Sequence, residues 1–144
     1  MRIFLDANIL FSAAKSNGAV RHLLELVLGA GHECVVNAYV TEEARRNLAA
    51  KGPESMDFLE RLLSRLTVAP VQSQQTSLKT DPPLPEDDRP ILAAAIHNGC
   101  AALVTGDRAH FGPLYGKTIE GVAIHSPRSL AEALGLAQPG KRNR

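Results

Sequence analysis

The feature that most constrains the fold of this chain is a short apolar run at its amino end that stops at a carboxylate. Residues 2–5 lead directly into Asp6, and a second apolar run, residues 102–104, leads through a turn glycine to Asp107. Such runs read as buried strands of a parallel α/β sheet, in which the strands' carboxyl ends line the ligand site. Two carboxylates held close together raise each other's pKa unless a cation neutralises them. The pattern therefore predicts a metal site at one edge of the sheet.

Length and composition restrict the class of protein. The 144 residues fit one domain with a hydrophobic core. Sixteen basic and fifteen acidic residues leave a formal net charge of +1, so any basic surface that attracts nucleic acid must be local. Aromatic residues make up 4% of the chain and Trp is absent, which argues against a stacking platform for single-stranded bases.

The cysteines and the hydropathy pattern predict a reduced, cytoplasmic protein. Cys34 and Cys100 lie far apart and form neither a Cys-x-x-Cys motif nor a zinc spacing, so we expect two small buried hydrophobic side chains. No apolar run approaches the roughly 20 residues that a membrane helix needs. We expect no signal peptide and no membrane partner.

Strand and helix patterns alternate along the chain. Residues 19–28 carry apolar side chains at the spacing of one buried helix face, and residues 33–36 form a short apolar run typical of a buried strand. The remaining expected elements are a short apolar segment at 8–14, a helix around 42–48 capped by Asn37 or Thr41, a helix at 55–66, a strand at 67–69, a loop at 71–85, a helix opened by Asp87 or Asp88 and closed by Gly99, the strand to Val104, a strand at 122–124, and a helix from Pro127 to about Leu134.

This alternation predicts a three-layer α/β/α domain with a central parallel sheet and the first strand in its middle. The domain is expected to span residues 1–136. The loop at 71–85 is not a domain boundary, because neither side of it would hold a complete core. Residues 137–144 include a basic carboxyl-terminal run and are expected to be a disordered tail.

Four acidic residues are the candidates for chemistry. Asp88 heads the helix that leads into the strand before Asp107, and Glu43 lies on the helix after the second strand. Asp88 could serve only as a helix cap, and Glu43 could be a solvated surface charge. Asp6 and Asp107 are harder to explain in that way, because a carboxylate beside a buried strand is costly to desolvate without a partner.

The order of these residues resembles the PIN domain, and most closely its small prokaryotic branch that includes VapC-type toxins. The resemblance covers residues 2 to about 134. The segments that carry it are Asp6-Ala-Asn8, Thr41-Glu-Glu43-Ala-Arg-Arg-Asn-Leu48, Asp88-Arg-Pro-Ile-Leu-Ala-Ala-Ala95 and Leu103-Val-Thr-Gly-Asp107.

The resemblance implies a role for each matching position. The four acidic residues would be catalytic, and the three aspartates among them would bind Mg²⁺ or Mn²⁺. Asp87 competes with Asp88, and the family's spacing to the following apolar positions selects Asp88. The implied set is Asp6, Glu43, Asp88 and Asp107 as catalytic residues, Asp6, Asp88 and Asp107 as metal ligands, and Asn8 and Thr105 as supporting polar residues.

One departure from the family pattern follows Asp107. Many members carry a further acidic residue there, whereas this chain has Arg108-Ala-His110-Phe111. A second metal ion would then be weakly held or brought by the substrate. His110 could contact a phosphate or pack against its own helix start. Arg45, Arg46 and Arg108 could contact the RNA backbone, with solvated arginines as the alternative.

The implied function is a metal-dependent endoribonuclease that cleaves single-stranded RNA, as the toxin of a toxin–antitoxin pair. A carboxylate-held cation activates water and stabilises charge on phosphate oxygens, so no serine, cysteine or histidine nucleophile is needed. The implied partners are RNA, a cognate antitoxin and a second copy of the chain. A homodimer is also expected because the helices at 19–28 and 55–66 carry more leucine than one sheet face obviously needs.

Two alternatives remain open. The chain could be a non-catalytic PIN-like module that binds RNA or protein, although retention of all four carboxylates argues against it. It could also be a housekeeping RNA-processing nuclease. A haloacid-dehalogenase phosphatase is excluded, because that class needs a second aspartate where this chain has Asn8.

Overall fold

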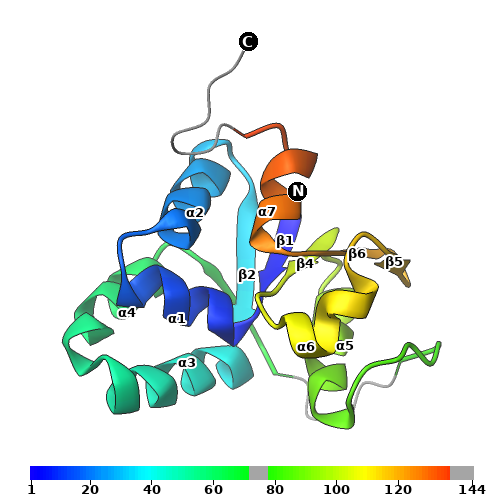
Figure 1. The fold of residues 1–144 in the computed structure, drawn as a ribbon, viewed down its shortest axis with the longest axis horizontal. Coiled ribbons are helices and arrows are strands. Elements are labelled where there is room, and N and C mark those ends of the chain that lie inside the picture. Colours follow the sequence, from blue (N-terminus) through cyan, green and yellow to red (C-terminus); the bar gives the residue numbers. More distant parts are fainter. Residues whose placement is uncertain (72–77, 137–144) are drawn as a thin grey trace.

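The structure is a computed structural model that describes residues 1–71 and 78–136. These residues form a sheet flanked by helices (Figure 1). The strands are β1 Arg2–Leu5, β2 Glu33–Asn37, β3 Thr67–Ala69, β4 Ala102–Val104, β5 Thr118–Ile119 and β6 Val122–His125. The α-helices are α1 Ala7–Lys15, α2 Ala19–Gly29, α3 Ala38–Lys51, α4 Met56–Leu63, α5 Arg89–His97, α6 Arg108–Phe111 and α7 Pro127–Ala133, with single 3-10 turns η1 Pro53–Ser55, η2 Glu86–Asp88 and η3 Gly112–Leu114.

The sheet has the order β3-β2-β1-β4-β6-β5, so the first strand lies in its interior as predicted. The pairs β1–β2, β1–β4, β2–β3 and β4–β6 are all parallel. Parallel neighbours need crossover connections, which the intervening helices provide. The fold class predicted from the alternating pattern is therefore confirmed.

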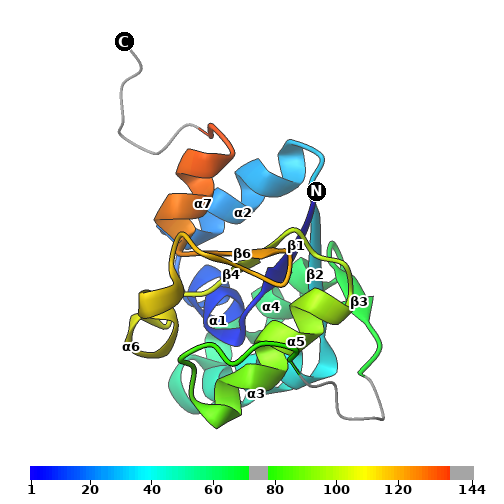
Figure 2. The ribbon, with the colours of Figure 1, turned by 90° about the vertical axis from the view of Figure 1, so that its right-hand side faces the viewer.

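Helices cover both faces of this sheet. Helix α1 contacts α2, α3 and α4, and these helices form one layer beside β1 and β2. Figure 1 shows this layer on one side of the two strands, with α5 and α6 on the other. In Figure 2 the molecule is turned by 90°, and α5 lies in front of the sheet while α1 and α4 lie behind it. The protein is thus a three-layer α/β/α domain.

The core lies between these layers and is mainly aliphatic. Ile3, Phe4 and Leu5 of β1 are all 0% exposed, as a central strand covered on both faces should be. Cys34 and Cys100 are free and buried, as predicted. Burial raises the pKa of the Cys34 thiol to about 12, so this cysteine is an inert core residue rather than a nucleophile.

An edge hairpin was not predicted from the sequence. Strands β5 and β6 pair antiparallel, and only Glu120 and Gly121 connect them. Both connecting residues have positive φ values, 48° and 88°, as a tight two-residue hairpin turn requires. Asn-Gly or Asp-Gly would have signalled this turn, whereas Glu is rare at such an angle. The sheet is therefore parallel except at this edge.

The helices also differ from prediction in two places. Residues 8–14 were expected to be a short apolar segment, but α1 occupies them because the Asp6 side chain accepts a hydrogen bond from Ala7 N and caps the helix directly after β1. Helix α4 ends at Leu63 rather than Leu66, since the chain tightens into a turn in which Leu66 N donates to Leu63 O. Between the two predicted caps of α3, Asn37 is the one used.

The loop predicted at 71–85 is irregular in its described part, and Glu120 fastens it to the hairpin. One carboxylate oxygen of Glu120 accepts hydrogen bonds from Lys79 N and from both Thr80 N and Thr80 Oγ1. Residues 72–77 of this loop and the predicted tail 137–144 lie outside the described residues. Within the described residues, none of the helices has the length and apolar character needed to cross a membrane.

We expect Leu103→Ala to lower the free energy of unfolding by about 2–5 kcal/mol, because this β4 side chain is 0% exposed and its loss leaves a cavity. Val68→Ala on β3 is the control, since Val68 is 59% exposed and surface changes usually stay within about 0.5 kcal/mol. Urea unfolding measures both. Equal losses in the two variants would contradict the burial described for β4.

Candidate metal centre

The sheet register brings the ends of β1 and β4 together. Leu5 pairs with Val104, and Asp6 N donates to Val104 O at 3.1 Å, so Asp6 and Thr105 follow at neighbouring positions. Thr105 is 0% exposed and Asp6 is 7% exposed. Two strand ends 99 residues apart in the chain thus deliver a carboxylate and a hydroxyl to one buried point.

Asp6 is held by three donors. Its Oδ1 accepts from Ala7 N at 2.7 Å, and its Oδ2 accepts from Thr105 Oγ1 at 2.7 Å and from Asn8 Nδ2 at 3.3 Å. Burial raises the pKa of Asp6, which these hydrogen bonds lower in part, and the negative charge of Asp88 adds a further rise. The carboxylate is therefore fixed in position but still electrostatically unfavourable.

Asn8 and Thr105, to which the family resemblance gives a supporting polar role, connect Asp6 to the loop before α6. Thr105 Oγ1 accepts from Asp107 N at 3.1 Å, and Asn8 Oδ1 accepts from Gly106 N at 2.7 Å. Tyr115, which the sequence did not single out, donates its hydroxyl to Thr105 O at 2.8 Å. This network fixes the backbone that carries Asp107 relative to the end of β1.

Asp88 reaches the same place from α5. It stands at the cap position of α5, yet its side chain makes no capping hydrogen bond, so the cap-only alternative does not describe it. Its Oδ2 atom is buried and makes no hydrogen bond, although His110 Nδ1 lies 2.8 Å away in an ion-pair contact that lacks hydrogen-bond geometry. Asp87, the competing residue, is exposed. The structure therefore brings Asp88, not Asp87, toward Asp107.

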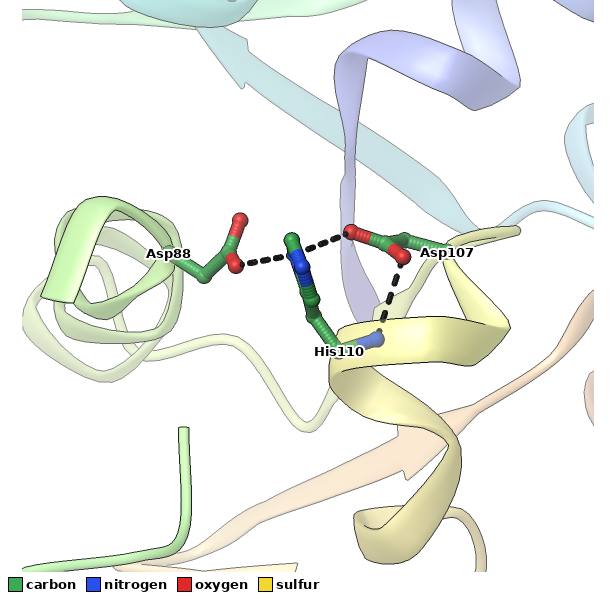
Figure 3. Close-up of side chains that lie close together, drawn as sticks. All are labelled: Asp88, Asp107 and His110. Atoms are coloured by element: carbon green, nitrogen blue, oxygen red, sulfur yellow. Dashed lines mark hydrogen bonds and ion pairs between the residues drawn. The ribbon is translucent and has the colours of Figure 1, made fainter. Parts of the chain in front are cut away.

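His110 lies between two aspartates. Its Nδ1 is 2.8 Å from Asp88 Oδ2 and 3.0 Å from Asp107 Oδ2, as Figure 3 shows. One ligand atom from each of the three residues lies within 4.8 Å of the others. The sequence had left His110 as a phosphate contact or a helix-surface residue. Its spacing of three residues from Asp107, one helical turn, was the available signal once α6 was known to begin there.

Glu43 lies near the other carboxylates on α3. Burial raises its pKa, the charge of Asp6 raises it further, the nearby Arg46 lowers it, and Asp88 adds a smaller rise. Burial likewise raises the pKa of Asp88 against the lowering effect of His110, and Asp107 adds to the rise. The four predicted acidic residues therefore act on one another electrostatically.

The three predicted arginines have different surroundings. Arg45 makes a two-bond ion pair with Glu60 of α4, at 2.8 and 3.0 Å, which ties α3 to α4. Arg46 and Arg108 are exposed, near Glu43 and Tyr115 respectively. Arg46 and Arg108 are thus the better placed of the three to meet a substrate, and a role for any of them in RNA binding stays a prediction.

The donor set fits a divalent cation. Asp88 Oδ2 is a buried acceptor that lacks a hydrogen bond, and such an atom usually has a partner. Burial and like charge raise the pKa of three neighbouring carboxyl groups, and the positive charge of a bound cation would lower these pKa values. Carboxylate oxygens are the ligands that Mg²⁺ and Mn²⁺ prefer. The residues present therefore suit such an ion.

Fold and site together define a class: an α/β/α domain whose strand ends gather carboxylates able to hold a divalent ion. The chain belongs to the PIN-domain family, whose model matches residues 2–109. It is also similar in fold to a chain in the crystal structure of VapBC2 from Rickettsia felis bound to a DNA fragment from their promoter. That match has a TM-score of 0.60 and 19% sequence identity, and it covers 88% of this chain and 98% of that one. None of the curated proteins matches this sequence. The predicted family is confirmed.

We expect Asp88→Asn to stabilise the metal-free protein at neutral pH. The folded pKa of Asp88 lies above its usual 3.8, so the folded protein keeps this proton to higher pH than the unfolded chain does. The stability of the wild type should therefore fall as pH rises from about 4 through the raised pKa. The variant should lose less stability over that range.

The measurement is urea unfolding in EDTA at several pH values. Glu54→Gln, an exposed charge change on η1, is the control and should follow the wild-type pH profile. A steeper loss of stability with rising pH in Asp88→Asn than in the wild type would show that the carboxylate is favourably placed without metal.

Proposed function

We propose that this protein is a metal-dependent endoribonuclease that cleaves single-stranded RNA. PIN-domain proteins are nucleases that use divalent metals, which gives the general class. The observation that carries the proposal for this chain is the cluster of Asp88, Asp107 and His110, in which a buried Asp88 oxygen has no hydrogen bond. Asp6 lies close enough for the charge of Asp88 to raise its pKa. RNA as the substrate follows from the resemblance to VapC-type toxins, and Mg²⁺ or Mn²⁺ follows from the oxygen-rich ligand set.

The three aspartates would hold the ion. When bound, a divalent ion supplies a nucleophilic water at neutral pH and stabilises charge developing on the phosphate oxygens. The chain's own task is to fix the ligands before substrate arrives. Thr105 and Asn8 do so by donating to Asp6 Oδ2, and Thr105 also accepts from Asp107 N. Ligands held in this way need little rearrangement in the reaction.

Glu43 would act as a proton acceptor. A carboxyl group whose pKa is raised is a better proton acceptor near neutral pH than an ordinary carboxylate. Burial and the charge of Asp6 give Glu43 that character. Arg108, at the start of α6 beside Asp107, would bind a substrate phosphate, and Arg46 would do the same on the side of α3.

The strongest test compares two adjacent aspartates. Outer partners of a metal site are typically worth about 10–100-fold in activity, so removing a ligand should cost at least about 100-fold. We expect Asp88→Asn to lose RNA cleavage by at least that factor. Asp87→Asn, an exposed neighbour with the same charge change, should stay within a few-fold of wild type.

Cleavage of a labelled single-stranded RNA is measured with Mn²⁺ or Mg²⁺ and with EDTA. Equal rates for wild type and Asp88→Asn would reject the mechanism in which Asp6, Asp88 and Asp107 hold the metal ion. Binding of RNA without metal-dependent cleavage in the wild type would favour the non-catalytic binding module.

We further propose that the protein is the toxin of a toxin–antitoxin pair and acts in the cytoplasm. The similar fold of a VapBC2 chain supports this, together with the resemblance to VapC-type toxins. A small DNA-binding protein encoded beside this chain would favour the toxin role. Its absence would favour the housekeeping RNA-processing nuclease.

We also propose a homodimer, on the basis of the family resemblance rather than of the leucine-rich helices. The leucines of α2 and α4 are mostly consumed by the monomer core, since Leu23, Leu24, Leu59, Leu62 and Leu63 are all buried. Neither helix contributes an exposed large hydrophobic side chain, within the part of the chain that the structure describes. The dimer proposal therefore depends on family resemblance.

Light scattering at micromolar concentration tests the dimer. We expect twice the mass of the 15.4 kDa chain. A monomer mass would show that the leucine-rich helices serve only the core. The measurement needs no metal or RNA, so its result is independent of the nuclease proposal.

A further inference from the structure

The contact between His110 and the two aspartates has the spacing of a coordination site. Nδ1 of His110 lies 2.8 Å from Asp88 Oδ2 and 3.0 Å from Asp107 Oδ2. Figure 3 shows the imidazole edge pointing between the two carboxylates. In an octahedral site with bonds of about 2.1 Å, ligands at right angles lie roughly 3 Å apart. Both distances match that spacing.

Main-chain contacts hold His110 close to the two aspartates. Asp107 Oδ1 accepts from His110 N at 3.1 Å, so the carboxylate that would bind metal also caps the short helix that carries the imidazole. The next residue, Phe111, is 0% exposed and anchors that helix in the core. His110 is therefore held near the carboxylates by its own main chain, while its side chain stays half exposed.

A simple ion pair is the alternative explanation, in which protonated His110 only neutralises two acids. That explanation leaves Asp88 Oδ2 without a hydrogen bond although it is buried and 2.8 Å from Nδ1. The ring nitrogen is near the oxygen without being aligned to donate to it. An ion placed among the three atoms would serve both carboxylate oxygens and the nitrogen.

We propose that His110 Nδ1 is a direct ligand of the divalent ion held by Asp88 and Asp107, and that this nitrogen makes the site prefer Mn²⁺ to Mg²⁺. Mg²⁺ favours carboxylate, carbonyl and water oxygens. Mn²⁺ also binds carboxylate oxygens, but as a transition-metal ion it accepts an imidazole nitrogen more readily than Mg²⁺ does. The site therefore combines two carboxylate ligands, Asp88 and Asp107, with one nitrogen ligand.

This inference rests on the metal site of the proposed function but not on RNA cleavage. It is tested on the full-length protein without RNA, with Mn²⁺ and Mg²⁺ as the only probes. Spin-echo modulation of bound Mn²⁺ detects a coordinated ¹⁴N nucleus directly. Calorimetry gives the dissociation constants of the two ions.

His110→Asp and His110→Gln are the test variants. His110→Asp replaces the nitrogen ligand with an oxygen ligand, so this variant should still bind Mn²⁺ but lose the ¹⁴N signal. Its ratio of Mg²⁺ to Mn²⁺ dissociation constants should be at least about tenfold lower than that of the wild type. His110→Gln should also lose the signal. His22→Ala changes an exposed histidine on α2 and should keep the wild-type signal and ratio. Thermal unfolding in EDTA verifies that each variant is folded.

Absence of the ¹⁴N signal in Mn²⁺-loaded wild type would overturn the proposal, since His110 would then have moved away from the ion. An unchanged affinity ratio in a folded His110→Asp protein would overturn the selectivity claim. Failure to bind Mn²⁺ at all would overturn it as well. A nitrogen signal in a protein that does not cut RNA would support the inference while rejecting the nuclease proposal, so the two failures are distinguishable.

Discussion

The buried hydrogen bond from Thr105 Oγ1 to Asp6 Oδ2 is the interaction on which the rest of the site depends. It joins the ends of the two central parallel strands, and the same hydroxyl accepts from Asp107 N. A buried carboxylate is costly without partners, so this donor makes it possible for Asp6 to sit 7% exposed at the sheet edge. The register Leu5–Val104 fixes which side chains meet there. A shift of one residue would turn each of these side chains to the opposite face of the sheet.

Around this point the protein gathers negative charge rather than dispersing it. Burial is the first cause of the raised pKa of Asp6, Glu43 and Asp88, and their mutual repulsion adds to it. Folding therefore opposes the ionised state that cation binding requires. Such unfavourable electrostatic interactions are typical of functional sites, where binding of a ligand removes the repulsion. The packed aliphatic core and the parallel sheet supply the stability that tolerates it.

The sequence was sufficient for features that depend on local pattern. Apolar runs ending in Asp6 and Asp107 predicted the strand ends, and the alternation of elements predicted the layers. The choice between Asp87 and Asp88 stayed open on local pattern and was made by the resemblance to the PIN family. Other features depend on contacts that no local pattern contains. The pairing of Arg45 with Glu60 joins separate helices, the β5–β6 hairpin lacks the usual turn residues, and the placement of His110 between Asp88 and Asp107 needed the positions of α5 and α6. The helix at residues 8–14 was missed because Asp6 both ends a strand and caps α1.

Asp6 and Asp107 each cap a helix with their side chains, and each also lies at a strand end where carboxylates gather. Asparagine caps a helix about as well as aspartate does. An Asp→Asn change needs only one base change in the codon, and it would preserve the helix start while removing the charge. Descendants of this gene that keep the helix start and lose a carboxylate charge at the end of β1 or β4 are therefore a single base change away. In these two residues the charge can therefore change during evolution without loss of the fold.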